Sequence, residues 1–205
     1  MNVTLVDDPE LVAMLGYPKT QERTLQVVHQ SDIIKRLMQR LQPKRFGGEF
    51  KMDPRVEMGI LFENMLEQAL VQKYATLRPG EIVSDEGVYM SPDGINPLLD
   101  AGEEYKATFM SCRPDKDAPS DDPKYVVLDE VGMPRLKFIH WFFQMKGYAK
   151  WLQVERFLLR VLFVCGDYMR PITPCFKTFD IRFTQEEIDE NWAMLMVFAR
   201  SEKIL

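Results

Sequence analysis

Two kinds of hydrophobic pattern alternate along the chain. Apolar side chains recur every three or four residues in some stretches, which is typical of amphipathic helices, and form short runs between turn residues in others, which is typical of strands. The helical pattern covers about 31–41, 54–74 and 185–199, and a further helix is expected in the apolar and aromatic segment 136–157. A short helix is expected near 9–15.

End signals support three of these helices. Ser31 is placed to cap the first, and Asp53 with Pro54 suits the cap and first position of the second. Thr184, followed three residues later by Glu187, forms a capping box at the start of the last helix. Local sequence therefore marks where these helices begin.

Four strand-like runs complete the pattern. The run 82–90 is interrupted near Gly87, and the run 103–111 follows an expected tight turn at 100–102. Two more runs cover 157–164 and 176–183. This order of elements predicts an α/β or α+β fold with a central mixed sheet flanked by helices.

Composition narrows the class of protein. A chain of 205 residues with 46% hydrophobic and 28% charged residues is expected to fold as one soluble domain spanning 1–205. No apolar run is long enough to cross a bilayer, and the N-terminus lacks the features of a signal peptide, so a cytoplasmic location is expected. Within the domain we expect a helical, basic part at 1–50 and an exposed loop at 113–124, rich in proline and aspartate.

Charge is unevenly distributed. The net charge is −5, yet the segment 35–55 holds seven basic and two acidic residues, a local excess of five positive charges. A basic run is often only a solvated helix face, but it is also the usual footprint of phosphate binding. The candidates for contacts with a nucleic-acid backbone are Arg36, Arg40, Lys44, Arg45 and Arg55.

The chemistry centres on Asp93, Glu104 and Lys106. Side chains at i and i+2 of a strand share a face, so Glu104 and Lys106 project together, and a hairpin would bring Asp93 beside them. Two carboxylates can hold a hard divalent cation such as Mg²⁺, and a neighbouring lysine can orient a bound water. This is the equipment for metal-assisted hydrolysis of a phosphodiester.

These residues carry a family resemblance. The sequence Ser-Pro-Asp-Gly at 91–94, followed by Glu-Tyr-Lys at 104–106, resembles the PD-(D/E)XK nuclease superfamily, especially its lambda-exonuclease, RecB and Cas4-like branch. The family carries a glycine and an acid four residues apart on an earlier helix, matched by Gly59 and Glu63. It also carries a Gln-x-x-x-Tyr pattern on a later helix, matched by Gln144 and Tyr148. The resemblance implies a restriction-endonuclease-like core.

The resemblance also implies roles. Asp93, Glu104 and the backbone carbonyl of Tyr105 would hold Mg²⁺ or Mn²⁺, with Glu63 completing the site, and Lys106 would position the attacking water. Gln144 and Tyr148 would support the site or touch the DNA backbone, and Gly59 would let its helix approach the sheet closely.

The cysteines separate this chain from one branch of the family. Many Cas4-type nucleases bind an iron–sulfur cluster through four cysteines, whereas this chain has three, Cys112, Cys165 and Cys175, without metal-site spacing. We expect no iron–sulfur cluster, zinc site or disulfide framework, and no nucleotide cofactor.

The sequence thus predicts a metal-dependent deoxyribonuclease, with a phage-type exonuclease acting on double-stranded DNA ends in recombination, replication or repair as the favoured form. A structure-selective endonuclease or resolvase, a catalytically silent nucleic-acid-binding module and a coincidental motif stay open as alternatives. The resemblance further allows a homo-oligomer, a single-strand annealing or single-strand-binding protein as partner, and the host cytoplasm as location if the protein is viral.

Overall fold

The computed structural model describes residues 27–48 and 54–205, so the expected helix at 9–15 and the expected cap Asp53 lie outside the described residues. Its centre is a mixed sheet, because β5 runs parallel to β6 while the two outer strands run antiparallel to their neighbours. The order of the strands is β4 (Gly94–Asn96), β5 (Ala101–Thr108), β6 (Arg156–Phe163) and β7 (Cys175–Arg182).

A smaller sheet lies beside the first, with β3 (Val88–Met90) between β1 (Val28–His29) and β2 (Ile82–Val83). The predicted interruption of the run 82–90 is the turn between β2 and β3, where Gly87 has a φ of +78°. Glycine adopts this left-handed conformation without steric cost.

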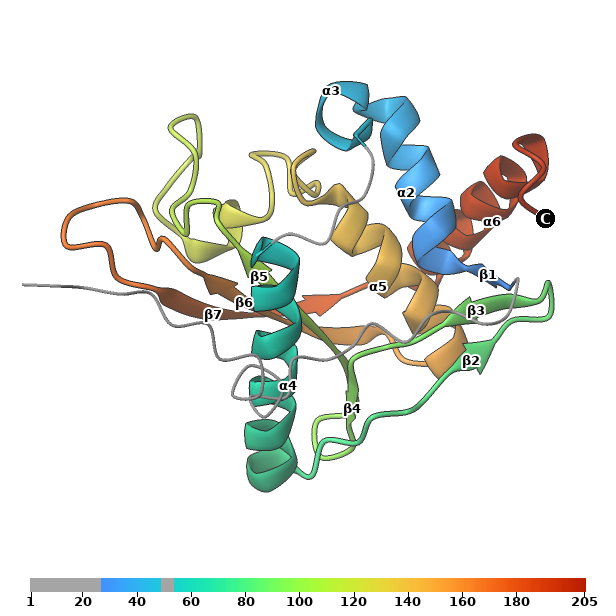
Figure 1. Cartoon of the computed structure of the whole chain (residues 1–205), viewed down its shortest axis with the longest axis horizontal. Helices are drawn as coiled ribbons and strands as arrows, with labels where there is room; N and C mark the ends of the chain where they lie inside the picture. The colour runs from blue at the N-terminus through green and yellow to red at the C-terminus, as the bar shows by residue number, and fades with distance from the viewer. Residues whose placement is uncertain (1–26, 49–53) are drawn as a thin grey trace, which may run out of the picture.

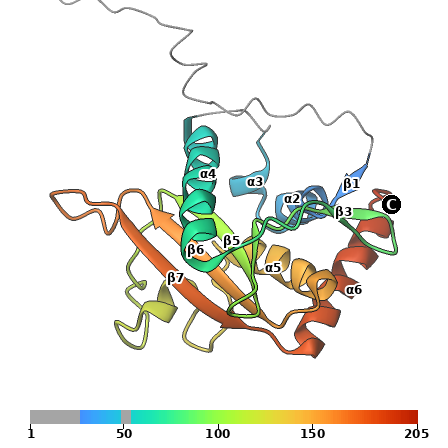
Figure 2. The ribbon, with the colours of Figure 1, turned by 90° about the horizontal axis from the view of Figure 1, so that it is seen from below.

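Helices cover both faces of the central sheet. Helix α4 crosses one face, whereas α2, α5 and α6 lie on the other (Figures 1 and 2). The predicted fold, a mixed sheet flanked by helices, is therefore confirmed. None of the described helices is long and apolar enough to span a membrane. The helices are α2 (Gln30–Leu41), α3 (Pro43–Phe46), α4 (Pro54–Tyr74), α5 (Ile139–Leu152) and α6 (Gln185–Ser201), with a 3₁₀ turn η1 (Pro123–Val126).

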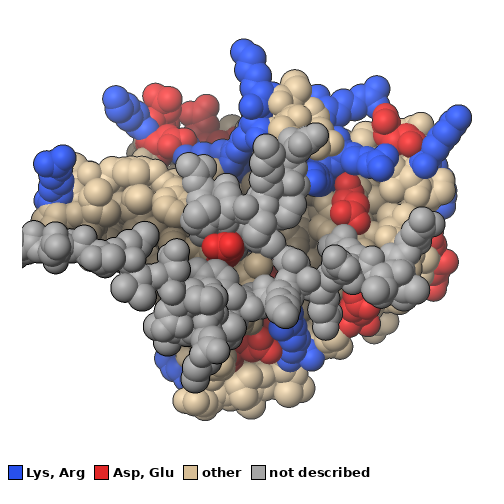
Figure 3. Space-filling model, viewed as in Figure 1, with Lys and Arg blue, Asp and Glu red and all other residues tan. Residues whose placement is uncertain are grey.

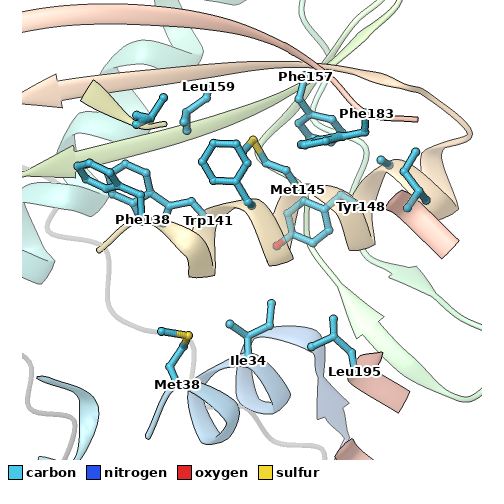
Figure 4. Packing of buried hydrophobic residues seen from close by; sticks show 14 of the residues in the cluster. Ile34, Met38, Phe138, Trp141, Met145, Tyr148, Phe157, Leu159, Phe183 and Leu195 are labelled. Carbon is cyan, nitrogen blue, oxygen red and sulfur yellow. The ribbon is translucent and has the colours of Figure 1, made fainter. Parts of the chain in front are cut away.

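The main hydrophobic core is built around α5. Figure 4 shows this helix between the strands, which contribute Phe157 and Leu159, and helix α2, which contributes Ile34 and Met38. Met145 of α5 is fully buried within this core. A second, smaller core under α4 joins Phe62, Leu70 and Tyr105 on the opposite face of the sheet.

Two predicted boundaries are wrong. Helix α2 starts one residue before Ser31, which therefore does not cap it; His29 takes the cap position without a side-chain hydrogen bond. Strand β5 starts at Ala101 rather than 103, because Gly102 already pairs with Ile95 and Phe157. The capping box of Thr184 and Glu187 is confirmed.

The start of α2 is locked to the middle of α5. Gln30 is 1% exposed, and its side-chain amide donates hydrogen bonds to the backbone carbonyls of Phe143 (3.1 Å) and Gln144 (3.3 Å). Asn191 of α6 donates to the same Phe143 carbonyl at 3.1 Å. Gly147 makes room for this contact, since a Cβ there would lie 1.8 Å from the Gln30 amide nitrogen. Three helices thus meet at the Phe143 carbonyl.

We expect Gly147→Ala to lower the free energy of unfolding by about 2–4 kcal/mol, because the methyl group displaces Gln30 and leaves buried polar groups unpaired. Urea denaturation measures this change. Gly59→Ala in α4 is the matched control, since its added Cβ would meet no described atom within 4 Å. Equal losses of stability in the two variants would contradict the claim that Gly147 makes room for the Gln30 side chain.

Candidate active site

Strand β5 sends acidic side chains to both faces of the sheet. Glu104 and Lys106 project to the face covered by α5, while Glu103 and Tyr105 project to the face covered by α4. Glu103 and Glu104 are both fully buried. The two adjacent glutamates therefore lie in different surroundings, Glu104 on the α5 side of the sheet and Glu103 on the α4 side.

The β4–β5 hairpin brings Asp93 to Glu104 and Lys106, as predicted. Asp93 directly precedes β4, whose first residue Gly94 pairs with Glu103. The Asp93 carboxylate accepts a hydrogen bond from the backbone N–H of Tyr105 at 2.7 Å. Beyond the pair of Gly94 and Glu103, β4 no longer lies beside β5, and the Asp93 side chain accepts the next hydrogen bond from β5 in its place.

This hydrogen bond also orients the carbonyl of Tyr105. The N–H and C=O groups of one strand residue point to the same lateral side. The Tyr105 carbonyl consequently points to the side on which Asp93 lies, beyond the end of β4. This orientation agrees with the expected role of the Tyr105 carbonyl as a ligand of a metal ion held beside Asp93.

The carboxylates form one electrostatic cluster. Burial and the charge of Asp93 raise the pKa of Glu104 to about 8, and the same two causes raise the pKa of Glu63 to about 7. Burial raises the pKa of Asp93. Glu63 of α4 therefore belongs to the cluster.

Lys106 is the counter-charge of this cluster. Its ammonium forms an ion pair with Glu104. Burial disfavours the ammonium, but the charges of Glu104, Asp93 and Glu63 outweigh burial and raise the pKa of Lys106. The lysine is thus a cation at neutral pH, suited to orienting a water or a phosphate oxygen and not to removing a proton.

The donor set fits a divalent cation. Both carboxylate oxygens of Glu104 are buried, and the partner that the structure gives this carboxylate is the Lys106 ammonium, so an oxygen remains to bind an ion. Within the described residues, no group of three or more His, Cys, Asp and Glu side chains is arranged to hold a metal by itself. The fit is therefore to an ion such as Mg²⁺, which binds through one or two carboxylates and keeps several waters.

Helix α5 adds the predicted Gln-x-x-x-Tyr pair. The Gln144 side-chain amide donates a hydrogen bond to the Tyr148 hydroxyl at 2.7 Å, one helical turn apart. Tyr148 is 4% exposed, and its pKa is raised by burial and by the charge of Glu104. The pair therefore stands next to the carboxylate cluster.

His140 is a member of the site that the motifs do not include. Burial lowers its pKa to about 3, with further contributions from the positive charges of Lys106 and Arg45. Its Nδ1 atom is buried and has no hydrogen-bond partner. His140, Gln144 and Tyr148 recur every four residues on one face of α5, a spacing that could have indicated the histidine in the sequence.

A second overlooked feature lies on the other face of β5. Glu103 accepts hydrogen bonds from Arg160 of β6 (2.8 Å), Asn96 of β4 (3.0 Å) and the Tyr105 hydroxyl (2.6 Å). This network ties β5 to both neighbouring strands. The adjacent pair of glutamates and the arginine within an apolar strand are its signals in the sequence.

The basic residues predicted to contact phosphate differ in their position relative to the site. Arg45 lies near the site, since its charge acts on His140. Arg40 forms an ion pair with Glu202 of α6 instead. Arg36 and Lys44 are exposed, and the side chain of Arg55 lies outside the described residues. Lys and Arg side chains gather over α2 and α3 along one edge of the face in Figure 3.

One expected role is not supported. Gly59 is predicted to permit a close approach of its helix to the sheet, yet a Cβ at this position would have no described atom within 4 Å. The approach of α4 to β5 is made instead by Phe62 and Leu70 packed with Tyr105.

No protein-family model and no curated protein sequence matches this chain. Its structure is similar to that of an alkaline exonuclease from Laribacter hongkongensis, at a TM-score of 0.50 and 14% identity, over 88% of this chain and 89% of that one. The complex of that exonuclease with dAMP gives the same values. A phage-related exonuclease from Haemophilus somnus has a TM-score of 0.49 at 12% identity, over 83% of this chain and 79% of that one.

At such low identity, the likeness to the alkaline exonuclease concerns the fold. It spans most of both chains. The chain therefore shares the fold of this alkaline exonuclease, in agreement with the exonuclease resemblance of its motifs.

Proposed function

We propose that this chain is a metal-dependent nuclease that hydrolyses phosphodiester bonds of DNA. The observation that carries the proposal is the convergence of Asp93, Glu104 and Lys106, with Glu63, in one cluster. The pKa values of its carboxylates are raised, and the fully buried Glu104 is paired with Lys106. Perturbed ionisable groups of this kind are typical of functional sites. Asp93, Glu104 and the Tyr105 carbonyl would hold Mg²⁺ or Mn²⁺.

The bound ion would lower the pKa of a coordinated water and stabilise charge on the phosphate. The residues of the chain do the rest. Lys106, once Glu104 is neutralised by the ion, can donate hydrogen bonds to the attacking water or to a phosphate oxygen. Glu63 can accept a hydrogen bond from a water of the site, while Gln144 fixes the Tyr148 hydroxyl beside it.

Exonuclease action on double-stranded ends is the form we favour. The motif at 91–94 and 104–106 resembles the lambda-exonuclease branch, and both the alkaline exonuclease and its dAMP complex share the fold. A silent binding module usually lacks one of the reactive groups, whereas Asp93, Glu104 and Lys106 are all present here.

Cleavage of matched linear and covalently closed circular duplex DNA tests the proposal. With Mg²⁺ or Mn²⁺ we expect loss of the linear DNA only, and no loss in EDTA, because the reaction requires both an end and a metal. Cleavage of both substrates would indicate an endonuclease or resolvase. Metal-dependent cleavage of neither would contradict the nuclease and leave a binding module on this fold.

Metal binding and catalysis should separate in two variants. We expect Asp93→Asn to lower Mn²⁺ affinity more than about 100-fold, since a direct ligand is lost. Lys106→Met should keep Mn²⁺ binding and lower the cleavage rate by about 10²- to 10⁴-fold. Calorimetry and single-turnover cleavage measure the two effects, with Asp117→Asn, an exposed loop residue, as the control. Native cleavage by Lys106→Met would refute the role of the lysine.

The stability of the metal-free protein should fall as pH rises from about 5 to 8. The folded-state pKa values of Glu63 (about 7) and Glu104 (about 8) exceed the ordinary value of 4.5, so the folded state binds more protons than the unfolded state in this window. Mn²⁺ competes with these protons, so its stabilising effect should grow with pH. Melting temperatures with and without Mn²⁺ measure this, and a flat profile would argue against the buried carboxylates.

A further inference from the structure

Three cations lie together beyond the end of β5. Lys137, two residues before α5, has a pKa lowered by burial and by repulsion from Arg135 and Arg45. Arg45 also acts on His140, which in turn feels the charge of Lys106. Lys137 and Arg135 also contact one and the same carboxylate, that of Asp115, so these cations lie beside one another.

Arg45 lies close to the end of β5 that carries Lys106. The Arg45 guanidinium approaches the Sδ atom of Met110 at 3.9 Å, and Met110 follows Lys106 by four residues. An extended chain of that length spans at most about 14 Å. The Cα atoms of Lys106 and Met110 are therefore at most about this far apart, which places Arg45 near the end of β5 that carries Lys106.

A carboxylate already occupies the cationic cluster. Asp115 of the loop 113–124 accepts a hydrogen bond from the Lys137 ammonium at 2.9 Å and forms an ion pair with Arg135. One anionic group thus bridges two cations, as a phosphate group would. The side chain of Asp115 is 49% exposed, whereas those of Arg135 and Lys137 are 12% and 28% exposed.

The difference in exposure indicates that Asp115, and not Arg135 or Lys137, is the partner that can move out of the cluster. The two cations are recessed, and the Arg135 side chain is fixed by a hydrogen bond from its Nε to the Leu128 carbonyl at 2.8 Å. Asp115 approaches from the solvent side on a loop. Arg45 forms no ion pair with any residue in the described part of the chain, so the cluster keeps a positive charge even with Asp115 in place.

We propose that Arg135 and Lys137, with Arg45 beside them, form a subsite for a phosphate group of the DNA backbone, and that Asp115 holds this subsite until DNA displaces it. The inference rests on the proposed nuclease function and deepens it, since it names where the strand is held outside the reactive centre. The acidic loop thereby lowers affinity for DNA and limits binding to strands that can replace the carboxylate.

The test measures equilibrium DNA binding in EDTA as a function of NaCl concentration, so that no cleavage occurs. We expect Asp115→Asn to bind a short labelled duplex about three- to fivefold more tightly, because the competing anion is removed while the side-chain shape is kept. The matched control is Asp122→Asn, which makes the same charge change in the same loop, where Asp122 pairs only with the exposed Lys124. Equal effects of the two variants would overturn the inference.

A second pair of variants guards against a folding defect in Asp115→Asn. Lys137→Gln should weaken binding and reduce the salt slope by about one, because one phosphate contact is lost. Lys124→Gln should change neither, and in the Lys137→Gln background the effect of Asp115→Asn should shrink. Native binding by Lys137→Gln would mean that Asp115 only anchors the loop.

Two duplexes, one with a 5′-phosphate and one with a 5′-hydroxyl, distinguish a terminal phosphate from an internal phosphodiester as the group that the subsite binds. An effect confined to duplexes with a 5′-phosphate assigns the subsite to a terminal phosphate, and an equal effect on 5′-hydroxyl duplexes assigns it to an internal phosphodiester. If the native chain binds neither duplex, the proposed function itself fails. If the native chain binds both and Asp115→Asn matches Asp122→Asn, only the subsite fails.

Discussion

The whole site depends on which way the side chains of β5 point. Successive side chains of a strand project to opposite faces, so a slip of one residue would exchange Glu104 and Lys106 for Glu103 and Tyr105. The buried ion pair between Glu103 and Arg160 (2.8 Å) prevents this exchange, since either charge without its partner would be strongly unfavourable. An ion pair on one face thus fixes the reactive groups on the other.

Burial gives these reactive groups their character. Glu104 is fully buried beside Asp93, and the Lys106 ammonium is paired with it, while the charge of Arg78 also acts on Asp93 and Glu63. Ionised carboxylates in such a place are unfavourable unless a cation joins them. Under the proposed function, the site would couple proton release to metal binding and stability, and Lys106, freed from its pairing with Glu104 by a bound ion, would be available to contact substrate.

Helix α5 joins the reactive centre to the rest of the molecule. One of its faces carries His140, Gln144 and Tyr148, and its buried side chains fill the main core. Gln30 of α2 reaches its carbonyls through the gap left by Gly147. The cations that Asp115 bridges, Arg135 and Lys137, lie just before this helix begins, so the proposed phosphate subsite and the candidate active site adjoin the same helix.

The sequence by itself indicated strands β2, β3, β5, β6 and β7, most helices and the grouping of Asp93, Glu104 and Lys106, because alternation, capping and hairpin spacing are local properties of the chain. The short strands β1 and β4 were not predicted. Only the tertiary structure decided the rest. His140 joins the site through the approach of Lys106 and Arg45, and Asp115 reaches Lys137 across 22 residues. The start of α2 follows from the contacts of Gln30 with α5 rather than from a cap at Ser31. These features depend on contacts between distant segments; the spacing of His140 with Gln144 and Tyr148 indicates a shared helix face but not what that face meets.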